Sequence, residues 1–69
     1  MSATKFKERF CECLRYSNVT QVELANAIHV TKQCISDYKS GRIEPSIDTL
    51  FSICQFLDVS ADYLLGLTD

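Results

Sequence analysis

The stretch HVTKQCISDYKSG, residues 29–41, decides how this chain is interpreted. Thr31 is placed to cap a helix from about residue 32 to 39, and Gly41 stands just past its end, where a left-handed residue is common. The apolar side of that helix consists of only three residues, Cys34, Ile35 and Tyr38. A helix that buries so little is expected to keep its outer face for a partner.

The outer face of this helix has the chemistry of a base-reading surface. It carries four short or flexible polar side chains, Lys32, Gln33, Ser36 and Asp37. Gln can pair with adenine through two hydrogen bonds, Asp can accept from the cytosine amino group, and Lys can reach guanine or phosphate. The residues alone leave two interpretations open: a solvated polar face without a partner, or a face that enters the major groove of DNA.

Two helices are expected before this stretch. The first runs from about residue 4 to 17, and its apolar residues recur at helical spacing: Phe6, Phe10, Cys13 and Leu14. Thr20 and Glu23 then form a capping box that starts a second helix, which ends near His29. The apolar residues of the second helix are Leu24, Ala25 and Ile28.

Two more helices are expected after it. Ser46, next to Pro45, caps a fourth helix whose apolar residues are Ile47, Leu50, Phe51, Cys54 and Leu57. Ser60 caps a short fifth helix, ADYLL, which Gly66 closes. The pattern predicts an all-α fold of five short helices in one domain over residues 1–69.

The charge of the chain is unevenly distributed. The net charge of −2 and the pI near 5.2 are unusual for a nucleic-acid-binding domain. Residues 1–45 hold all seven Lys and Arg against five Asp and Glu, a net of +2, whereas residues 46–69 hold four Asp and no basic residue. A negatively charged partner is therefore expected to bind the first two-thirds of the chain.

Several functional classes are disfavoured by composition. One histidine, no paired carboxylates on a shared face and no glycine-rich phosphate loop leave no catalytic set, so the chain is not expected to be an enzyme or to hold a metal or another cofactor. The apolar runs are too short for a membrane span, and no signal peptide precedes them, so a cytoplasmic protein is expected. The four cysteines are expected to be reduced and mostly buried: Cys11, Cys13, Cys34 and Cys54.

Residues 19–66 resemble the Cro and lambda-repressor type of helix-turn-helix domain, the Xre family. The resemblance rests on a set of short motifs: Thr20-Gln21-x-x-Leu24-Ala25, Val30-Thr31, Ile35-Ser36, Gly41, Pro45-Ser46, Thr49-Leu50, Leu57, Val59-Ser60 and Asp62-Tyr63-Leu64-Leu65. It implies a lambda-repressor-like domain with the helix-turn-helix at about 21–39. It also implies a sequence-specific regulator of transcription that binds double-stranded DNA as a homodimer on a palindromic operator. Repression is favoured over activation, because so short a chain has little surface for recruiting polymerase.

The resemblance also implies roles for individual residues. The base-contacting positions of the family fall on Lys32, Gln33, Ser36 and Asp37. Its phosphate-contacting positions fall on Gln21, Ser40 and Arg42. The turn position usually held by glycine is His29, for which we expect a left-handed backbone with mild strain. Asp37 faces the groove as an anion, which could sharpen selection for cytosine or mark a loss of DNA binding.

Three further hypotheses come from the residues themselves. The acidic segment 46–69, together with Asp37, motivates an alternative function as a protein-interaction module, for example an antitoxin or an antagonist of a regulator. Cys34 on the recognition helix suggests a thiol sensor, although a buried thiol is inert. The leucines near the end of the sequence suggest a homodimer interface: Leu64, Leu65 and Leu67. No small-molecule ligand is expected.

Overall fold

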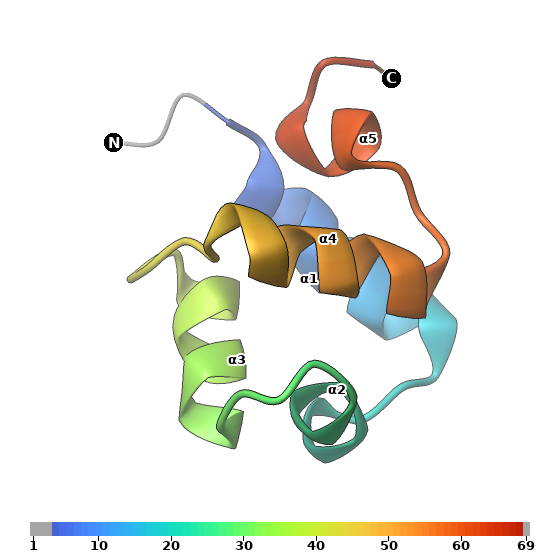
Figure 1. Cartoon of the computed structure of the whole chain (residues 1–69). Helices are drawn as coiled ribbons and strands as arrows, with labels where there is room; N and C mark the ends of the chain where they lie inside the picture. Colours follow the sequence, from blue (N-terminus) through green and yellow to red (C-terminus); the bar gives the residue numbers. More distant parts are fainter. Residues whose placement is uncertain (1–3, 69) are drawn as a thin grey trace.

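The computed structural model describes residues 4–68, and this part of the chain folds into five α-helices without a β-strand (Figure 1). The helices are α1 (Phe6–Ser17), α2 (Gln21–Ala27), α3 (Lys32–Ser40), α4 (Ile47–Leu57) and α5 (Ala61–Leu65). The prediction of an all-α fold with five short helices is confirmed. Within the described range, no helix has the length and apolar character needed to cross a bilayer.

Side-chain caps start four of the five helices. The hydroxyls of Thr20, Thr31, Ser46 and Ser60 each accept a hydrogen bond from the backbone N–H three residues ahead. At α2 the Glu23 carboxylate also accepts from the backbone N–H of Thr20 at 3.1 Å, which completes the predicted capping box. Each cap satisfies an N–H group that would otherwise lack an intrahelical partner, and a lost cap typically costs about 1 kcal/mol.

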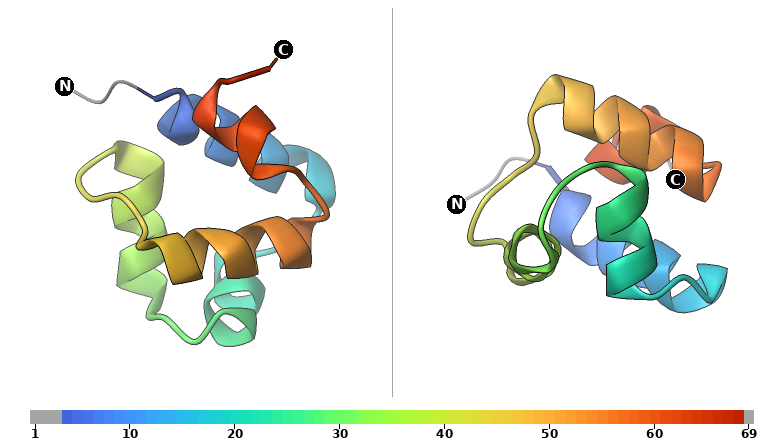
Figure 2. Two further views of the ribbon diagram at one scale, coloured as in Figure 1. Left: turned by 45° about the horizontal axis from the view of Figure 1, so that its top comes forward. Right: turned by 60° about the horizontal axis from the view of Figure 1, so that its bottom comes forward.

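The core is formed by one apolar face from each helix. Its buried members are Phe6, Phe10, Leu14, Leu24, Ala25, Ile28, Ile35, Tyr38, Ile53 and Leu64. α1 packs against α3, α4 and α5, while α2 packs against α3 and α4 (Figure 2). The Phe6 and Phe10 rings stack with their centroids 5.0 Å apart, and both meet the Tyr38 ring edge-on.

The buried face of α4 differs from the predicted one. Ile53 is fully buried, whereas Ile47 and Phe51 are 85% and 62% exposed. The apolar residues of α4 cover a wider arc than one stripe, so helical spacing alone did not decide which edge of that arc faces the core. α4 is turned so that Ile53 points inward and Ile47 and Phe51 lie in solvent.

α5 is held against α1 by polar contacts as well as by Leu64. The Arg9 guanidinium donates to the carbonyl oxygens of Tyr63 (2.7 Å) and Thr68, and it lies 4.4 Å above the centre of the Tyr63 ring. The Tyr63 hydroxyl donates to the Glu12 carboxylate at 2.6 Å, and this hydrogen bond raises the pKa of Tyr63. Leu64 is fully buried within the single chain. The prediction that Leu64 forms part of a dimer interface was therefore wrong, because it has no surface to offer a partner.

The four cysteines are free thiols, and each is half-buried rather than mostly buried as expected. Burial raises the pKa of Cys13 and of Cys54, so both favour the unreactive thiol form at neutral pH. In the part of the chain that the structure describes, no group of His, Cys, Asp and Glu is arranged to hold a metal ion.

The turn between α2 and α3 requires a left-handed backbone at His29, whose φ is +59°. This confirms the expectation drawn from the sequence, since His is among the non-glycine residues that tolerate the conformation. The next residue, Val30, donates its backbone N–H to the Ala25 carbonyl at 3.0 Å, which closes the turn. The His29 side chain is exposed, so the free-energy cost at this position comes from the left-handed backbone conformation.

Replacing His29 with glycine is expected to stabilise the protein by about 0.5–1 kcal/mol. A left-handed L-residue costs roughly 1–2 kcal/mol, and glycine removes that cost while adding about 0.5–1 kcal/mol of unfolded-state entropy. His29→Val should instead destabilise, because a β-branched residue is strongly disfavoured there. Urea unfolding of the three proteins checks this; equal midpoints would show that the turn stores no strain.

Candidate nucleic-acid interface

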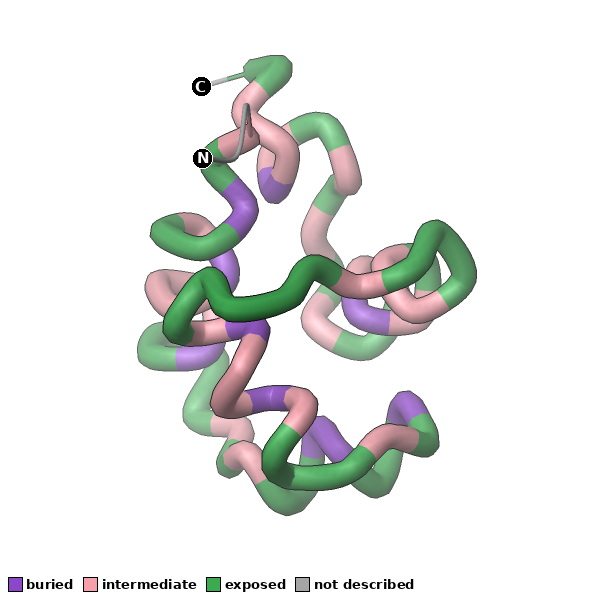
Figure 3. The backbone as a smooth tube through the Cα atoms, turned by 90° about the vertical axis from the view of Figure 1, so that its left-hand side faces the viewer, coloured by how far each residue is buried: buried purple, intermediate pink, exposed green. Residues whose placement is uncertain are grey.

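α2 and α3 form a helix-turn-helix unit whose second helix is anchored by few residues. The two helices run from Gln21 to Ser40. Only Ile35 and Tyr38 of α3 are buried, and burial raises the pKa of the Tyr38 hydroxyl. The rest of α3 is left at the surface, beside the exposed connection 41–46 that crosses the face shown in Figure 3.

The four predicted base-contacting residues lie together on the outer face of α3. Lys32 and Gln33 are exposed, and Ser36 and Asp37 are half-buried. Positions at this spacing occupy one side of a helix, opposite Ile35 and Tyr38. The arrangement brings the predicted residues together on one convex surface narrow enough for a major groove.

A hydrogen bond inside this face fixes the direction of the Gln33 amide. Its Nε2 group donates to the Asp37 carboxylate at 3.0 Å, one helical turn away. Because an ionised carboxylate can only accept, the nitrogen must face Asp37 and the amide cannot be reversed. The amide nitrogen carries two hydrogens, so one N–H and the Oε1 atom remain free. These two groups are the pair that recognises adenine.

The predicted phosphate contact at Gln21 is built into a second network that joins α2 to α3. Its Nε2 group donates to the Ser36 hydroxyl at 3.1 Å, and its Oε1 atom accepts from the Lys39 ammonium at 3.0 Å. Lys39 can only donate, so the direction of this amide is fixed as well. Gln21 therefore positions Ser36 and Lys39, and it keeps one N–H that could reach a phosphate.

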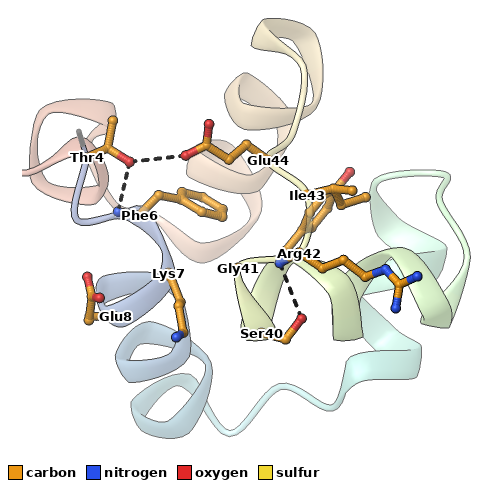
Figure 4. A pocket seen from close by; sticks show the side chains of 10 residues that line it. Thr4, Phe6, Lys7, Glu8, Ser40, Gly41, Arg42, Ile43 and Glu44 are labelled. Atoms are coloured by element: carbon orange, nitrogen blue, oxygen red, sulfur yellow. Dashed lines mark hydrogen bonds between the residues drawn. The ribbon is translucent and has the colours of Figure 1, made fainter. Parts of the chain in front are cut away.

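The end of α3 places the other two predicted phosphate contacts differently. The Ser40 hydroxyl donates to the Asp37 carbonyl at 3.1 Å, so its only hydrogen is already used at the helix end. Arg42 is exposed, and its backbone N–H donates to the Asp37 carbonyl at 2.9 Å. Figure 4 shows its guanidinium extending away from Ser40. Of the two, Arg42 has the side chain available for a phosphate.

Sequence reasoning missed a cation from α1 at this surface. Lys7 lines a groove of about 510 Å³ together with Ser40, Gly41 and Arg42 (Figure 4). A Cβ atom added at Gly41 would lie only 2.9 Å from the Lys7 Cδ atom. Residues 7 and 41 are joined only by the tertiary fold, and no local pattern in the sequence indicated this contact.

The hypothesis of a thiol sensor concerns Cys34, which follows Gln33 on α3. Cys34 is half-buried and packs against the core. Its backbone N–H is the donor that Thr31 caps at 3.1 Å. A modified thiol would therefore disturb the packing of α3, and the sensor hypothesis stays a prediction that thiol labelling of the folded protein can test.

Comparison with known proteins identifies the same helix-turn-helix unit. Residues 17–64 match the model of the helix-turn-helix family. The chain is 37% identical over 60 residues to YqaE, an uncharacterized HTH-type transcriptional regulator of Bacillus subtilis (strain 168), covering 87% of this chain and 52% of YqaE. It is 32% identical over 62 residues to RstR, the cryptic phage CTXphi transcriptional repressor of Vibrio cholerae serotype O1, covering 90% of this chain and 55% of RstR.

A solved structure supports the likeness. The P22 c2 repressor, crystallised in complex with a synthetic operator, superposes with a TM-score of 0.82 at 27% identity over 87% of this chain and 91% of that one. This chain spans about half the length of the curated relatives it matches. The similarity to those relatives therefore concerns the domain that carries α1 to α5.

Proposed function

The chain belongs to the helix-turn-helix family of Cro and lambda-repressor type, the Xre family, and from this premise we propose that it is a sequence-specific DNA-binding regulator of transcription. α3 enters the major groove of double-stranded DNA, and its outer face reads base edges. The observation that carries the proposal is the fixed Gln33–Asp37 pair, which presents a donor and an acceptor from an exposed helix.

The Gln33–Asp37 pair also bears on whether the acidic residue prevents DNA binding. Asp37 accepts a hydrogen bond from Gln33, so part of its charge is used to orient a neighbour. Its second oxygen has the acceptor chemistry that matches the amino group of cytosine. Its charge weakens non-specific attraction to phosphates, so base contacts contribute more to discrimination. This supports a reading role for Asp37 over a loss of DNA binding.

Repression by a homodimer on a palindromic operator is the form of regulation that we propose. RstR is named a transcriptional repressor, and the P22 c2 repressor was solved on an operator. A dimer would place two copies of α3 in successive major grooves, about one helical turn apart.

The dimer surface that we propose includes α4. Of the predicted leucines, Leu65 is half-buried and Leu67 is 72% exposed, which is a small apolar surface. Ile47 and Phe51 on α4 expose more, and they line an apolar groove with Leu50, Cys54, Val59 and Ala61. A second copy of the chain is the occupant we propose, because this groove lies outside the α3 surface and leaves that surface free for DNA.

Selection of bound duplexes from a random pool at low salt tests the proposed function. We expect a two-fold motif with half-sites about 10 base pairs apart. Protein whose helical circular dichroism confirms folding serves as the input. No enrichment from such protein would overturn the DNA-binding proposal and favour the protein-interaction module, for which the acidic segment 46–69 and the apolar α4 face would be the candidate surfaces.

Two substitutions separate base reading from phosphate binding. Gln33→Ala is expected to weaken binding to the selected site by about 1–3 kcal/mol and to relax preference at one base pair. Arg42→Ala is expected to weaken binding to all DNA sequences about equally. It should also lower the slope of log affinity against log salt concentration by about 1. Titration of selected and random duplexes measures both. Identical behaviour of the two variants would contradict this division of roles.

The dimer surface can be tested by changing single exposed side chains to aspartate. Phe51→Asp is expected to convert the dimer to a monomer at tens of micromolar, because it places a charge in the apolar groove. Tyr16→Asp is the control, since Tyr16 is 77% exposed on α1. Sedimentation equilibrium gives the mass of each protein. A monomeric wild-type protein, or a dimer that survives Phe51→Asp, would refute the α4 interface.

A further inference from the structure

The cations of this chain divide into two groups with different neighbours. Lys5 and Arg9 lie against α5: the Lys5 stem packs on Gly66, and Arg9 donates to Tyr63 and Thr68. The other five are Lys7, Arg15, Lys32, Lys39 and Arg42. Lys32, Lys39 and Arg42 belong to α3 or follow it directly, but Lys7 and Arg15 belong to α1, to which the sequence assigned no role at a partner surface.

Lys7 and Arg15 lie on the same side of α1 as Cys11, at the spacing i, i+4 and i+8. All three meet the end of α3. Lys7 packs beside Gly41, and the Cys11 thiol donates to the Lys39 carbonyl at 3.4 Å. Arg15 lines one groove with Gln21 and Lys39. This side of α1 therefore runs along the seam between α1 and α3.

Gly41 makes the close approach of Lys7 possible. A Cβ atom at position 41 would meet the Lys7 Cδ atom at 2.9 Å, so any other residue would displace the lysine stem. Gly41 also holds a left-handed conformation with φ of +80°, which favours glycine on its own account. The stem of Lys7 is thus supported beside Gly41, and Lys7 lines one groove with Ser40 and Arg42 (Figure 4).

Lys39 lies on the same seam, because its carbonyl accepts from the Cys11 thiol and its side chain lines one groove with Arg15. One of its ammonium hydrogens is donated to Gln21, and two remain for an anion. The acidic residues of α1 do not cancel this charge. The Glu12 carboxylate accepts from Tyr63 on the α5 side, and Glu8 lies on the far side of α1 from Ser40 in Figure 4.

We propose that Lys7, Lys39 and Arg15 form a basic strip that binds the phosphates of one DNA strand beside the groove occupied by α3. This rests on the proposed DNA-binding function and adds α1 to the interface. Eight residues of helix separate Lys7 from Arg15 by about 12 Å. That distance corresponds to roughly three to four phosphate steps at about 3.4 Å of duplex axis per strand charge. The strip explains how an acidic chain presents a locally positive surface to DNA.

The test compares three variants that remove one positive charge each: Lys7→Gln, Arg15→Gln and Lys5→Gln. Lys5 is the control because it is exposed, precedes the same helix and packs toward α5. Affinity for a random-sequence duplex is measured by fluorescence anisotropy between 50 and 200 mM salt. Circular dichroism checks that each variant is folded.

Lys7→Gln and Arg15→Gln are each expected to reduce the slope of log affinity against log salt concentration by about 0.9. Between 50 and 200 mM salt, each variant should therefore lose about 3.5-fold less affinity than the wild type loses. Lys5→Gln should keep the wild-type slope. Slopes of Lys7→Gln and Arg15→Gln equal to that of Lys5→Gln would overturn the strip while leaving DNA binding intact. Wild-type protein that binds no duplex at 50 mM salt would overturn the proposed function, and the strip with it.

Discussion

The packing of α3 on the aromatic pair of α1 is the contact on which the rest of this molecule depends. α3 buries only Ile35 and Tyr38, and the Tyr38 ring is held edge-on by Phe6 and Phe10. Edge-to-face contacts between aromatic rings contribute about 0.5–1.5 kcal/mol beyond the burial of their area. This small apolar anchor fixes the helix and leaves more than half of its circumference for polar side chains.

The polar face uses charged residues to fix the direction of neutral ones. Asp37 can only accept, and Lys39 can only donate, so each determines which way a glutamine amide points. The two amides therefore present defined donors and acceptors before any partner is met. Ordering these side chains in advance lowers the conformational entropy lost on association.

The local signals in the sequence were sufficient for the helices and for the residues grouped on α3. Hydroxyl caps and the capping box gave the start of four helices, and glycines gave the end of α3 and of α5, since these features depend on residues close in sequence. The left-handed turn at His29 was predicted from the resemblance to the family, in which glycine usually holds this position. The rotation of α4 was not predicted, because its apolar arc is wide enough to fit the core in more than one orientation.

Leu64 was misassigned because a fifth helix of five residues gives too little pattern to separate its buried side from its exposed side. Lys7 and Gly41 meet only through the tertiary fold, so their contact had no signature in the sequence.

The separation between the anchor of α3 and its outer face has a consequence for evolution. Lys32 and Gln33 are exposed and take no part in the core, so exchanging them changes the free energy of folding little. Ser36 is tied to Gln21 and is less free to vary. A lineage carrying this domain can therefore acquire new target sequences through a few substitutions on one helix, while the five-helix scaffold is inherited unchanged.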